Sequence, residues 1–215
     1  MLQVWGRRSS FNVQKVMWLI GELELPHHHI DAGGQFGGLD HPAFLAMNLH
    51  GRVPVIRDGD VIVWESHTIL RYLAARFGAG EFWSDDAATR ARVEGWMDWS
   101  QTALQPDFLG GVFWGFFRTP AAQRNWPAIR TALARCEVHF GKLDRLLDGR
   151  SFLLGEALSL ADITAGTSLF RYFGLEIERP RLPQVERWYR TLQQRTAFRE
   201  HVMIPFEELR GRLDY

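Results

Sequence analysis

The stretch from Gly51 to Leu73, GRVPVIRDGDVIVWESHTILRYL, decides the fold because its apolar residues change from strand spacing to helix spacing. Two short apolar runs, 53–57 and 61–64, flank Asp58-Gly59-Asp60. Asp-Gly between two apolar runs is a strong signal for a β-hairpin. From 66 to 77, apolar residues recur on one face of a helix. The stretch therefore predicts a β-hairpin that leads directly into a helix.

The residues before this stretch alternate between strand and helix patterns. We expect a strand at 2–5, a helix at 13–25 that Pro26 ends, a second strand at 27–31 and a short helix at 42–48. A glycine-rich loop lies between the second strand and the short helix. The N-terminal third is thus predicted to be βαβ, then α, then ββ, then α, an order that resembles thioredoxin.

Strand patterns nearly disappear beyond residue 78. Helices are expected at 86–104, 127–147, 163–173 and 183–194, with a final segment at 206–213. Ser159 and Asp162 form a predicted capping box ahead of the third of these helices. The predicted fold class is therefore α+β, with a thioredoxin-like domain at 1–78, a linker at 79–86 and an all-helical domain at 87–215.

Composition excludes several classes of protein. Lys+Arg and Asp+Glu number 25 each, so neither a nucleic acid nor an anionic membrane is an expected partner. The longest charge-free apolar stretch, 108–117, is too short for a bilayer, which needs about 20 helical residues. The first ten residues show no secretory signal, and Cys136 is the single cysteine. We therefore expect a cytoplasmic protein.

Three consecutive histidines, His27–His29, raise the question of a metal site. Consecutive residues on a strand point to opposite faces, so these three side chains cannot converge on one ion. No metal site is expected.

Three segments in order resemble the glutathione transferase family: 9–16 (SSFNVQKV), 48–56 (NLHGRVPVI) and 58–73 (DGDVIVWESHTILRYL). The capping segment 159–164 resembles the C-terminal domain of that family. The likeness covers nearly the whole chain and is greatest to theta- and nu-like bacterial members, with serine and asparagine in the first loop. The lack of a cysteine in that loop argues against omega- and beta-like members and glutaredoxins. The resemblance implies glutathione as co-substrate.

One end of the implied glutathione site holds the ligand's backbone and γ-glutamyl head. In the family, the proline at position 54 is cis and leaves the backbone of Val53 free to pair with extended glutathione. Ser66 is expected to cap the following helix, whose free amides bind the γ-glutamyl carboxylate. Glu65 is implied to take the ammonium group.

The other end must hold the glycyl carboxylate, which needs a cation. Arg52 is the first candidate and His50 the second. Phe36, in the glycine-rich loop, is a further candidate for packing over this end of the ligand.

Ser10 and Asn12 are the candidates for activating the glutathione thiol. A thiol has a pKa of about 8.5, so only a few per cent is thiolate at neutral pH. Hydrogen bonds to sulfur and a helix N-terminus both favour the anion. The family's motif places Ser10 at the activating position, with Asn12 as the rival. Either can instead cap the helix, and we expect one to cap while the other holds the sulfur.

An aromatic cluster in the second domain is the candidate wall for the second substrate, a small-molecule electrophile. Helical spacing of aromatic residues predicts either core or pocket, and both interpretations stay open. The candidate pocket residues are Phe11, Phe113, Trp114 and Phe117. In the family a nearby helix lines the dimer interface, and Gln101 is the candidate there for reaching the partner's glutathione.

These inferences predict a homodimeric glutathione transferase of the detoxifying type, in which the thiolate attacks a small apolar electrophile. Three alternatives remain. The first is a glutathione-dependent disulfide reductase, which the Ser10 and Asn12 pairing suggests. The second is a glutathione-dependent isomerase such as maleylacetoacetate isomerase, whose Ser- and Arg-rich loop differs at Asn12 and Gln14. The third is a non-catalytic glutathione-binding module.

Overall fold

The computed structural model describes residues 1–213 and divides the chain into two compact units. The first unit comprises Met1–Asp85 together with Thr196–Ile204, and the second comprises Asp86–Arg195 together with Pro205–Leu213. The first contains the β-sheet, and the second is helical.

Four strands form the sheet of the first unit: β1 (Leu2–Trp5), β2 (His27–Ile30), β3 (Val55–Asp58) and β4 (Val61–Trp64). Their order is β2-β1-β3-β4, with β1 parallel to β2 and antiparallel to β3. β3 and β4 are antiparallel, with Asp58 opposite Val61. The predicted hairpin is therefore confirmed.

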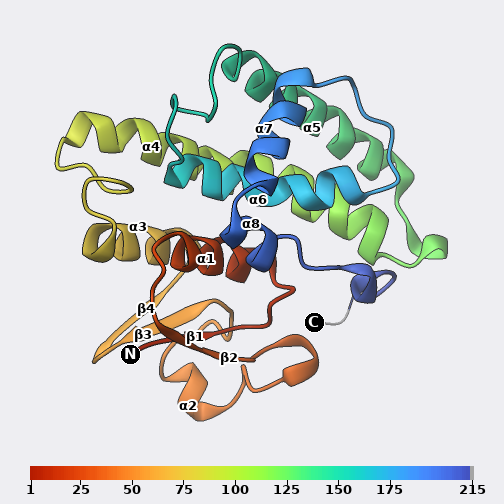
Figure 1. Cartoon of the computed structure of the whole chain (residues 1–215). Coiled ribbons are helices and arrows are strands. Elements are labelled where there is room, and N and C mark those ends of the chain that lie inside the picture. Colours follow the sequence, from red (N-terminus) through yellow and green to blue (C-terminus); the bar gives the residue numbers. More distant parts are fainter. Residues whose placement is uncertain (214–215) are drawn as a thin grey trace. The chain divides into compact units, whose positions relative to one another are not determined.

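Helices cover both faces of this sheet (Figure 1). α1 (Phe11–Glu22) and α3 (Ser66–Phe77) lie side by side on one face, and the short α2 (Pro42–Leu45) lies on the other. α1 ends three residues earlier than expected, and Glu24 beyond it has a positive φ of 50°. The buried apolar side chains of α1, α3 and the sheet form the core: Val4, Val13, Val16, Leu19, Ile20, Val55, Ile56, Ile69, Leu70 and Leu73.

Gly6 allows the end of β1 to approach α1 closely. A Cβ atom at this position would lie 2.4 Å from Cγ2 of Val13, and its φ of 148° disfavours other residues. This close approach fixes the path of the loop that carries the chain from the sheet to Ser10.

One helix departs from the predicted division of the chain. α8 (Thr196–His201) belongs to the first unit, although we expected every residue after 86 to form one helical domain. It packs on α1, where the rings of Trp18 and Phe198 meet edge to face with centroids 4.8 Å apart.

The second unit is built from long helices. α4 (Ala87–Trp99) continues into two π-helical segments, η2 (Ser100–Leu104) and η3 (Pro106–Arg118), and is followed by α5 (Trp126–Leu146), α6 (Leu160–Gly174) and α7 (Pro183–Gln193). Two corrections apply. The sequence did not predict the helix at 106–118, and the expected segment at 206–213 contains only one 3₁₀ turn, Glu207–Leu209.

Aromatic rings fill the core of this unit. Phe140 stacks on Tyr172 with ring centroids 4.1 Å apart, and Phe113 stacks on Phe117 at 5.2 Å. Cys136 is buried beside them, and this burial raises the pKa of its thiol to about 12. The large aromatic content of the sequence is therefore partly accounted for by this core.

The capping box at the start of α6 is confirmed. Asp162 is completely buried and accepts hydrogen bonds from the Ser159 amide at 3.0 Å and from the Leu153 amide at 2.8 Å. It therefore ties the preceding loop to the helix. Burial raises the pKa of this carboxyl to about 6, against the opposing effect of its hydrogen bonds.

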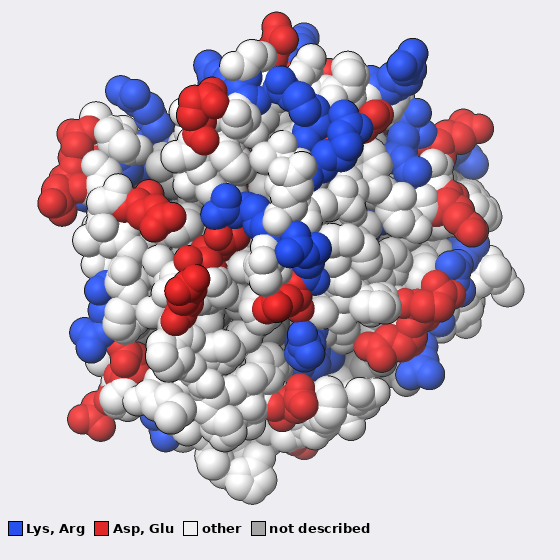
Figure 2. All heavy atoms as spheres, in the orientation of Figure 1, with Lys and Arg blue, Asp and Glu red and all other residues white. Residues whose placement is uncertain are grey.

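Charged side chains of both signs are mixed on the surface in view. Figure 2 shows acidic and basic side chains interspersed over this face, in keeping with equal numbers of the two signs in the chain. Within residues 1–213, none of the helices has the length and apolar character needed to cross a bilayer.

Candidate functional site

The start of α1 presents Ser10 and Asn12. Ser10 occupies the N-cap position in extended conformation, with φ −75° and ψ 124°, yet its hydroxyl makes no capping hydrogen bond. Oδ1 of Asn12 instead accepts a hydrogen bond from Nζ of Lys15 at 3.1 Å. The expectation that one of these two side chains caps the helix is therefore wrong. The Ser10 hydroxyl is not committed to the helix.

The start of α3 presents Glu65 and Ser66. Glu65, not Ser66, is the N-cap residue, which corrects the sequence-based prediction. Its φ of 69° is uncommon for a residue other than glycine, and such conformations concentrate at functional sites. Ser66 is the first helical residue, so its amide belongs to the helix N-terminus, which favours bound anions.

A buried side chain connects these two helix starts. Nζ of Lys15 lies 3.1 Å from Oδ1 of Asn12 on α1 and 3.1 Å from Nε2 of His67 on α3. Since His67 directly follows Ser66, both helix N-termini lie within reach of one lysine.

Asn48 holds the turn before β3, and the sequence reasoning missed it. This side chain is buried, donates to the Arg52 carbonyl at 2.9 Å and accepts from the His50 amide at 3.1 Å. The signal was an asparagine at the start of a turn, where its side chain readily bonds the backbone two residues on. Asn48 thus fixes the backbone from which both candidate cations project.

The Val53–Pro54 peptide bond at the end of this turn is cis, as the resemblance implied. Val53 precedes β3, so its amide and carbonyl take no part in the pairing of β3 with β1 and β4.

The candidates for the glycyl end are exposed. Arg52 lies on the surface, and the His50 ring lies against that of Trp64, with centroids 5.2 Å apart. Phe36, in a 3₁₀ turn at Gly34–Phe36, exposes 48% of its surface. A ligand role for these three residues stays a prediction.

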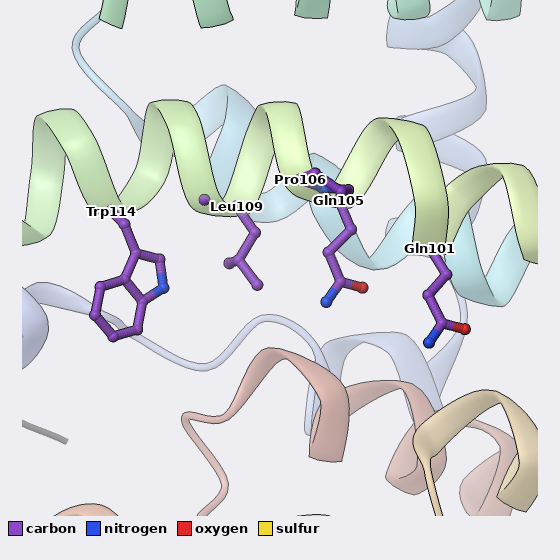
Figure 3. A pocket seen from close by; sticks show the side chains of 6 residues that line it. Gln101, Gln105, Pro106, Leu109 and Trp114 are labelled. Carbon is purple, nitrogen blue, oxygen red and sulfur yellow. The ribbon is translucent and has the colours of Figure 1, made fainter. Parts of the chain in front are cut away.

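A hollow of about 430 Å³ lies along η2 and η3 in the second unit. Figure 3 shows Gln101, Gln105, Leu109 and Trp114 projecting to the same side of this helix. The hollow thus combines an apolar wall, formed by a leucine and a tryptophan, with two side-chain amides.

The aromatic candidates divide between hollow and core. Trp114 lines the hollow, whereas Phe113 and Phe117 are fully buried and stack on one another in the core. Their place in the core departs from the expected pocket role and follows from helix geometry, because neighbouring residues face different sides. In the first unit Phe11 is buried, with the Lys15 ammonium 4.9 Å from its ring centre.

A thioredoxin-like unit with a cis-proline turn, joined to a helical unit, defines the class of the glutathione transferases. Two family models match the chain: the N-terminal domain of glutathione S-transferase at residues 5–81 and its C-terminal domain at residues 97–191. The chain belongs to the glutathione S-transferase family.

Individual relatives agree with this assignment. Glutathione S-transferase GstB of Escherichia coli K12 is 40% identical over 208 residues, covering 95% of this chain and 99% of the relative. Human glutathione S-transferase theta-1 is 32% identical over 61% of this chain and 57% of its own length.

A solved structure supports the same assignment. The theta class glutathione S-transferase of the citrus canker pathogen Xanthomonas axonopodis pv. citri, with glutathione bound, superposes with a TM-score of 0.89. It is 37% identical and covers 95% of this chain and 98% of its own.

Proposed function

We propose that this glutathione transferase binds glutathione along the first unit, with the γ-glutamyl head at the start of α3 and the sulfur at the start of α1. The observation that carries the proposal is the contact of Lys15 with both Asn12 and His67, because it brings the two helix N-termini together. The Ser66 hydroxyl and the free amides of α3 receive the carboxylate, and Glu65 receives the ammonium. Arg52, with His50 beside it, receives the glycyl carboxylate.

Activation of the thiol is assigned to Ser10 and Asn12. The Ser10 hydroxyl makes no capping bond, so it can donate to a sulfur anion. Asn12 already accepts from Lys15 through its oxygen, so its NH2 group points elsewhere and can donate too. Both groups stabilise the thiolate, which then attacks an electrophile.

The electrophile in this proposal is a small apolar molecule that uses the hollow beside Trp114 and Leu109. An apolar wall with a few polar groups is typical of small-molecule pockets, and Gln105 supplies such a group. Conjugation of this kind serves detoxification. We place the protein in the cytoplasm, where glutathione keeps thiols reduced.

We also propose a homodimer in which Gln101 reaches the partner's glutathione. The support is an exposed apolar row, Val61, Ile62 and Trp64, on β4, which is an edge strand of the sheet. Light scattering at micromolar concentration should give about twice the chain mass. A monomer would contradict both the dimer and the role of Gln101.

A second candidate reaction is glutathione-dependent disulfide reduction. Asn12 favours this reaction because its amide offers a second hydrogen-bond donor beside Ser10. Disulfide exchange has one thiolate that attacks and one that leaves, and such a donor can stabilise either. Cys136 cannot supply a thiol for that reaction because it is buried and its pKa is raised to about 12. Reduction would therefore use glutathione alone.

The test measures the pKa of bound glutathione by the ultraviolet absorbance of its thiolate, in parallel with conjugation, peroxide and disulfide assays. Ser10→Ala should raise the thiol pKa by about 1–2, given hydrogen bonds to charged groups of about 1.5–3 kcal/mol. Conjugation at pH 7 should fall, and part of it should return at higher pH. Ser84→Ala is the matched control, because Ser84 belongs to the same unit as Ser10 but is not a candidate site residue.

The outcomes separate the candidates. If Asn12→Ala shifts the thiol pKa and Ser10→Ala does not, the asparagine is the activating residue. If neither does, backbone amides and the helix N-terminus activate the thiol, and the proposed roles of both side chains fail.

A further inference from the structure

Lys15 is completely buried, although lysine is among the side chains least often found in a protein interior. The chain contains 25 Lys and Arg residues, and only Lys15 and Lys142 are lysine. Lys15 lies on α1 within an otherwise mostly apolar run, 13–20, and its side chain contacts His67 of α3. A buried ammonium costs free energy unless its donors are used.

The contacts of Lys15 are polar and specific. Its Nζ is 3.1 Å from Oδ1 of Asn12, 3.1 Å from Nε2 of His67 and 4.9 Å from the ring centre of Phe11. Burial lowers the pKa of Lys15 to about 7, while Glu65 acts to raise it. Burial lowers the pKa of His67 to about 2, helped by Lys15 and Arg71, so the imidazole stays neutral and its Nε2 can accept a hydrogen bond from the lysine.

This contact fixes the orientation of Asn12. An ammonium has three donors and no acceptor, so the atom of the asparagine side chain that faces it must be the oxygen. The NH2 group is then not used by Lys15, and Asn12 is partly exposed, so this group is available to donate to a ligand. Without Lys15 the amide could turn over and present its oxygen to the ligand, which would repel a thiolate.

The contact with Lys15 leaves the other ring nitrogen of His67 without a hydrogen-bond partner in the described part of the chain. When Nε2 accepts from Lys15, the ring proton must reside on Nδ1, and Nδ1 is buried with no hydrogen-bond partner among the described residues. Buried donors without partners are rare in native proteins, so this one needs an explanation. A cluster built for stability alone would be better served by apolar side chains.

We propose that Lys15 is a positioning residue for the thiol end of the glutathione site, orienting the Asn12 amide toward the sulfur and favouring the thiolate through its own positive charge. The inference rests on the proposed role of Asn12 in thiol activation. Lys15 need not touch glutathione, since it acts through Asn12 and across a short distance of low-polarity interior.

The first test uses the small number of lysines. Protein labelled with isotopes only at lysine should give two side-chain signals, from Lys15 and Lys142, whose pKa values can be followed by NMR. Glutathione should raise the pKa of Lys15 by about 1, because a thiolate nearby favours the ammonium. S-methylglutathione has the same carboxylates and ammonium but no thiol, and should shift it much less. The exposed Lys142 serves as the internal control.

The pKa responses of Lys15 to the two ligands decide whether the proposal holds. An equal response of Lys15 to both, or no response to either, would overturn the proposal. Because this test uses the unaltered protein, it does not depend on whether any variant folds.

The second test compares Lys15→Met with Lys142→Met. Lys15→Met should raise the pKa of bound glutathione by about 1, which means about tenfold less thiolate at neutral pH. Its affinity for S-methylglutathione should be unchanged, and Lys142→Met should match the parent in both measurements. If Lys15→Met weakens both ligands equally, Lys15 supports the γ-glutamyl end through Glu65, and the proposal fails.

Asn12→Ala distinguishes this failure from failure of the underlying function. If Asn12→Ala raises the thiol pKa and Lys15→Met does not, only the role of Lys15 is lost. If Asn12→Ala has no effect, the proposed role of Asn12 is lost, and the orienting role of Lys15 is lost with it.

Discussion

Nζ of Lys15 lies 3.1 Å from Nε2 of His67, and both side chains are buried between α1 and α3. Burial lowers the pKa of this lysine to about 7, against an ordinary value of 10.5. The lysine therefore changes its charge near neutral pH in the folded protein, but only well above that in the unfolded chain. The free energy of unfolding therefore depends on pH over the range in which the two states differ in protonation at this lysine.

The first prediction concerns stability against pH. Between about pH 7 and pH 10 the unfolded chain binds more protons at this lysine than the folded protein, so stability rises with pH there, by up to about 1.4 kcal/mol per pH unit. Below pH 7 the lysine is protonated in both states, and its contribution stays constant. Urea unfolding of the parent should show this rise from pH 7.5 to 9, and Lys15→Met should lack it. Equal slopes in the two proteins would contradict the shifted pKa, and Lys142→Met should retain the slope.

The second prediction concerns the γ-glutamyl head. Glu65→Gln and Ser66→Ala should each weaken glutathione about ten- to a hundredfold by calorimetry, because each removes a charge-assisted hydrogen bond of about 1.5–3 kcal/mol. Ser66→Ala should leave the melting temperature nearly unchanged, since Glu65 and not Ser66 is the N-cap residue. Glu81→Gln, an exposed acid of the same unit, is the control. Unchanged affinity in both variants would remove the head of the ligand from this position.

The third prediction concerns the glycyl end. If Arg52 holds the glycyl carboxylate, the parent should bind glutathione more tightly than its glycyl ethyl ester, by about tenfold for one exposed charge pair with hydrogen bonds. Arg52→Ala should bind the two ligands equally, whereas Arg76→Ala should keep the preference. If His50→Ala and not Arg52→Ala loses the preference, the histidine is the cation at this end.

The fourth prediction concerns the start of α6. Asp162→Ala should lower the free energy of unfolding by about 2–4 kcal/mol, since it leaves the buried Leu153 amide without an acceptor and removes the capping box. Asp86→Ala is the matched control, because Asp86 caps α4 through the Thr89 amide but is exposed. Asp86→Ala should lower the free energy of unfolding by less than Asp162→Ala does. Similar losses from the two substitutions would show that burial adds nothing to the cap.

The elements that local chemistry determines could be predicted closely. The β3–β4 hairpin follows from Asp58-Gly59, and α3 follows from the apolar spacing of 66–77, whose bounds agree with the structure. The capping box at Ser159 is likewise a matter of residues three apart. Each depends on neighbours in sequence, and no distant contact overrides it.

The elements that distant contacts determine could not be predicted. The helix expected at 86–104 is followed directly by η3, which begins at Pro106 and runs past Gly111 to Arg118. A Cβ at Gly111 would lie 2.5 Å from that of Ala132, so the glycine allows η3 and α5 to pack closely. The place of α8 depends on Phe198 meeting Trp18, far away in the chain, and no local pattern records that.

The candidate site shows the same division. The resemblance supplied the residues at its surface, including the cis proline at position 54. The residues beneath the surface, Lys15, His67 and Asn48, were missed because lysine, histidine and asparagine are common on protein surfaces. The available signal for Lys15 was its position within an apolar helical run.

The burial of Cys136 bears on how well the enzyme resists inactivation by electrophiles. Compounds that react with the glutathione thiolate also alkylate protein thiols in general. The chain's sole cysteine is 1% exposed with a pKa raised to about 12, so hardly any of it is nucleophilic at neutral pH. Incubation with an excess of a thiol-reactive electrophile, in the absence of glutathione, should therefore leave the cysteine unmodified and the enzyme fully active.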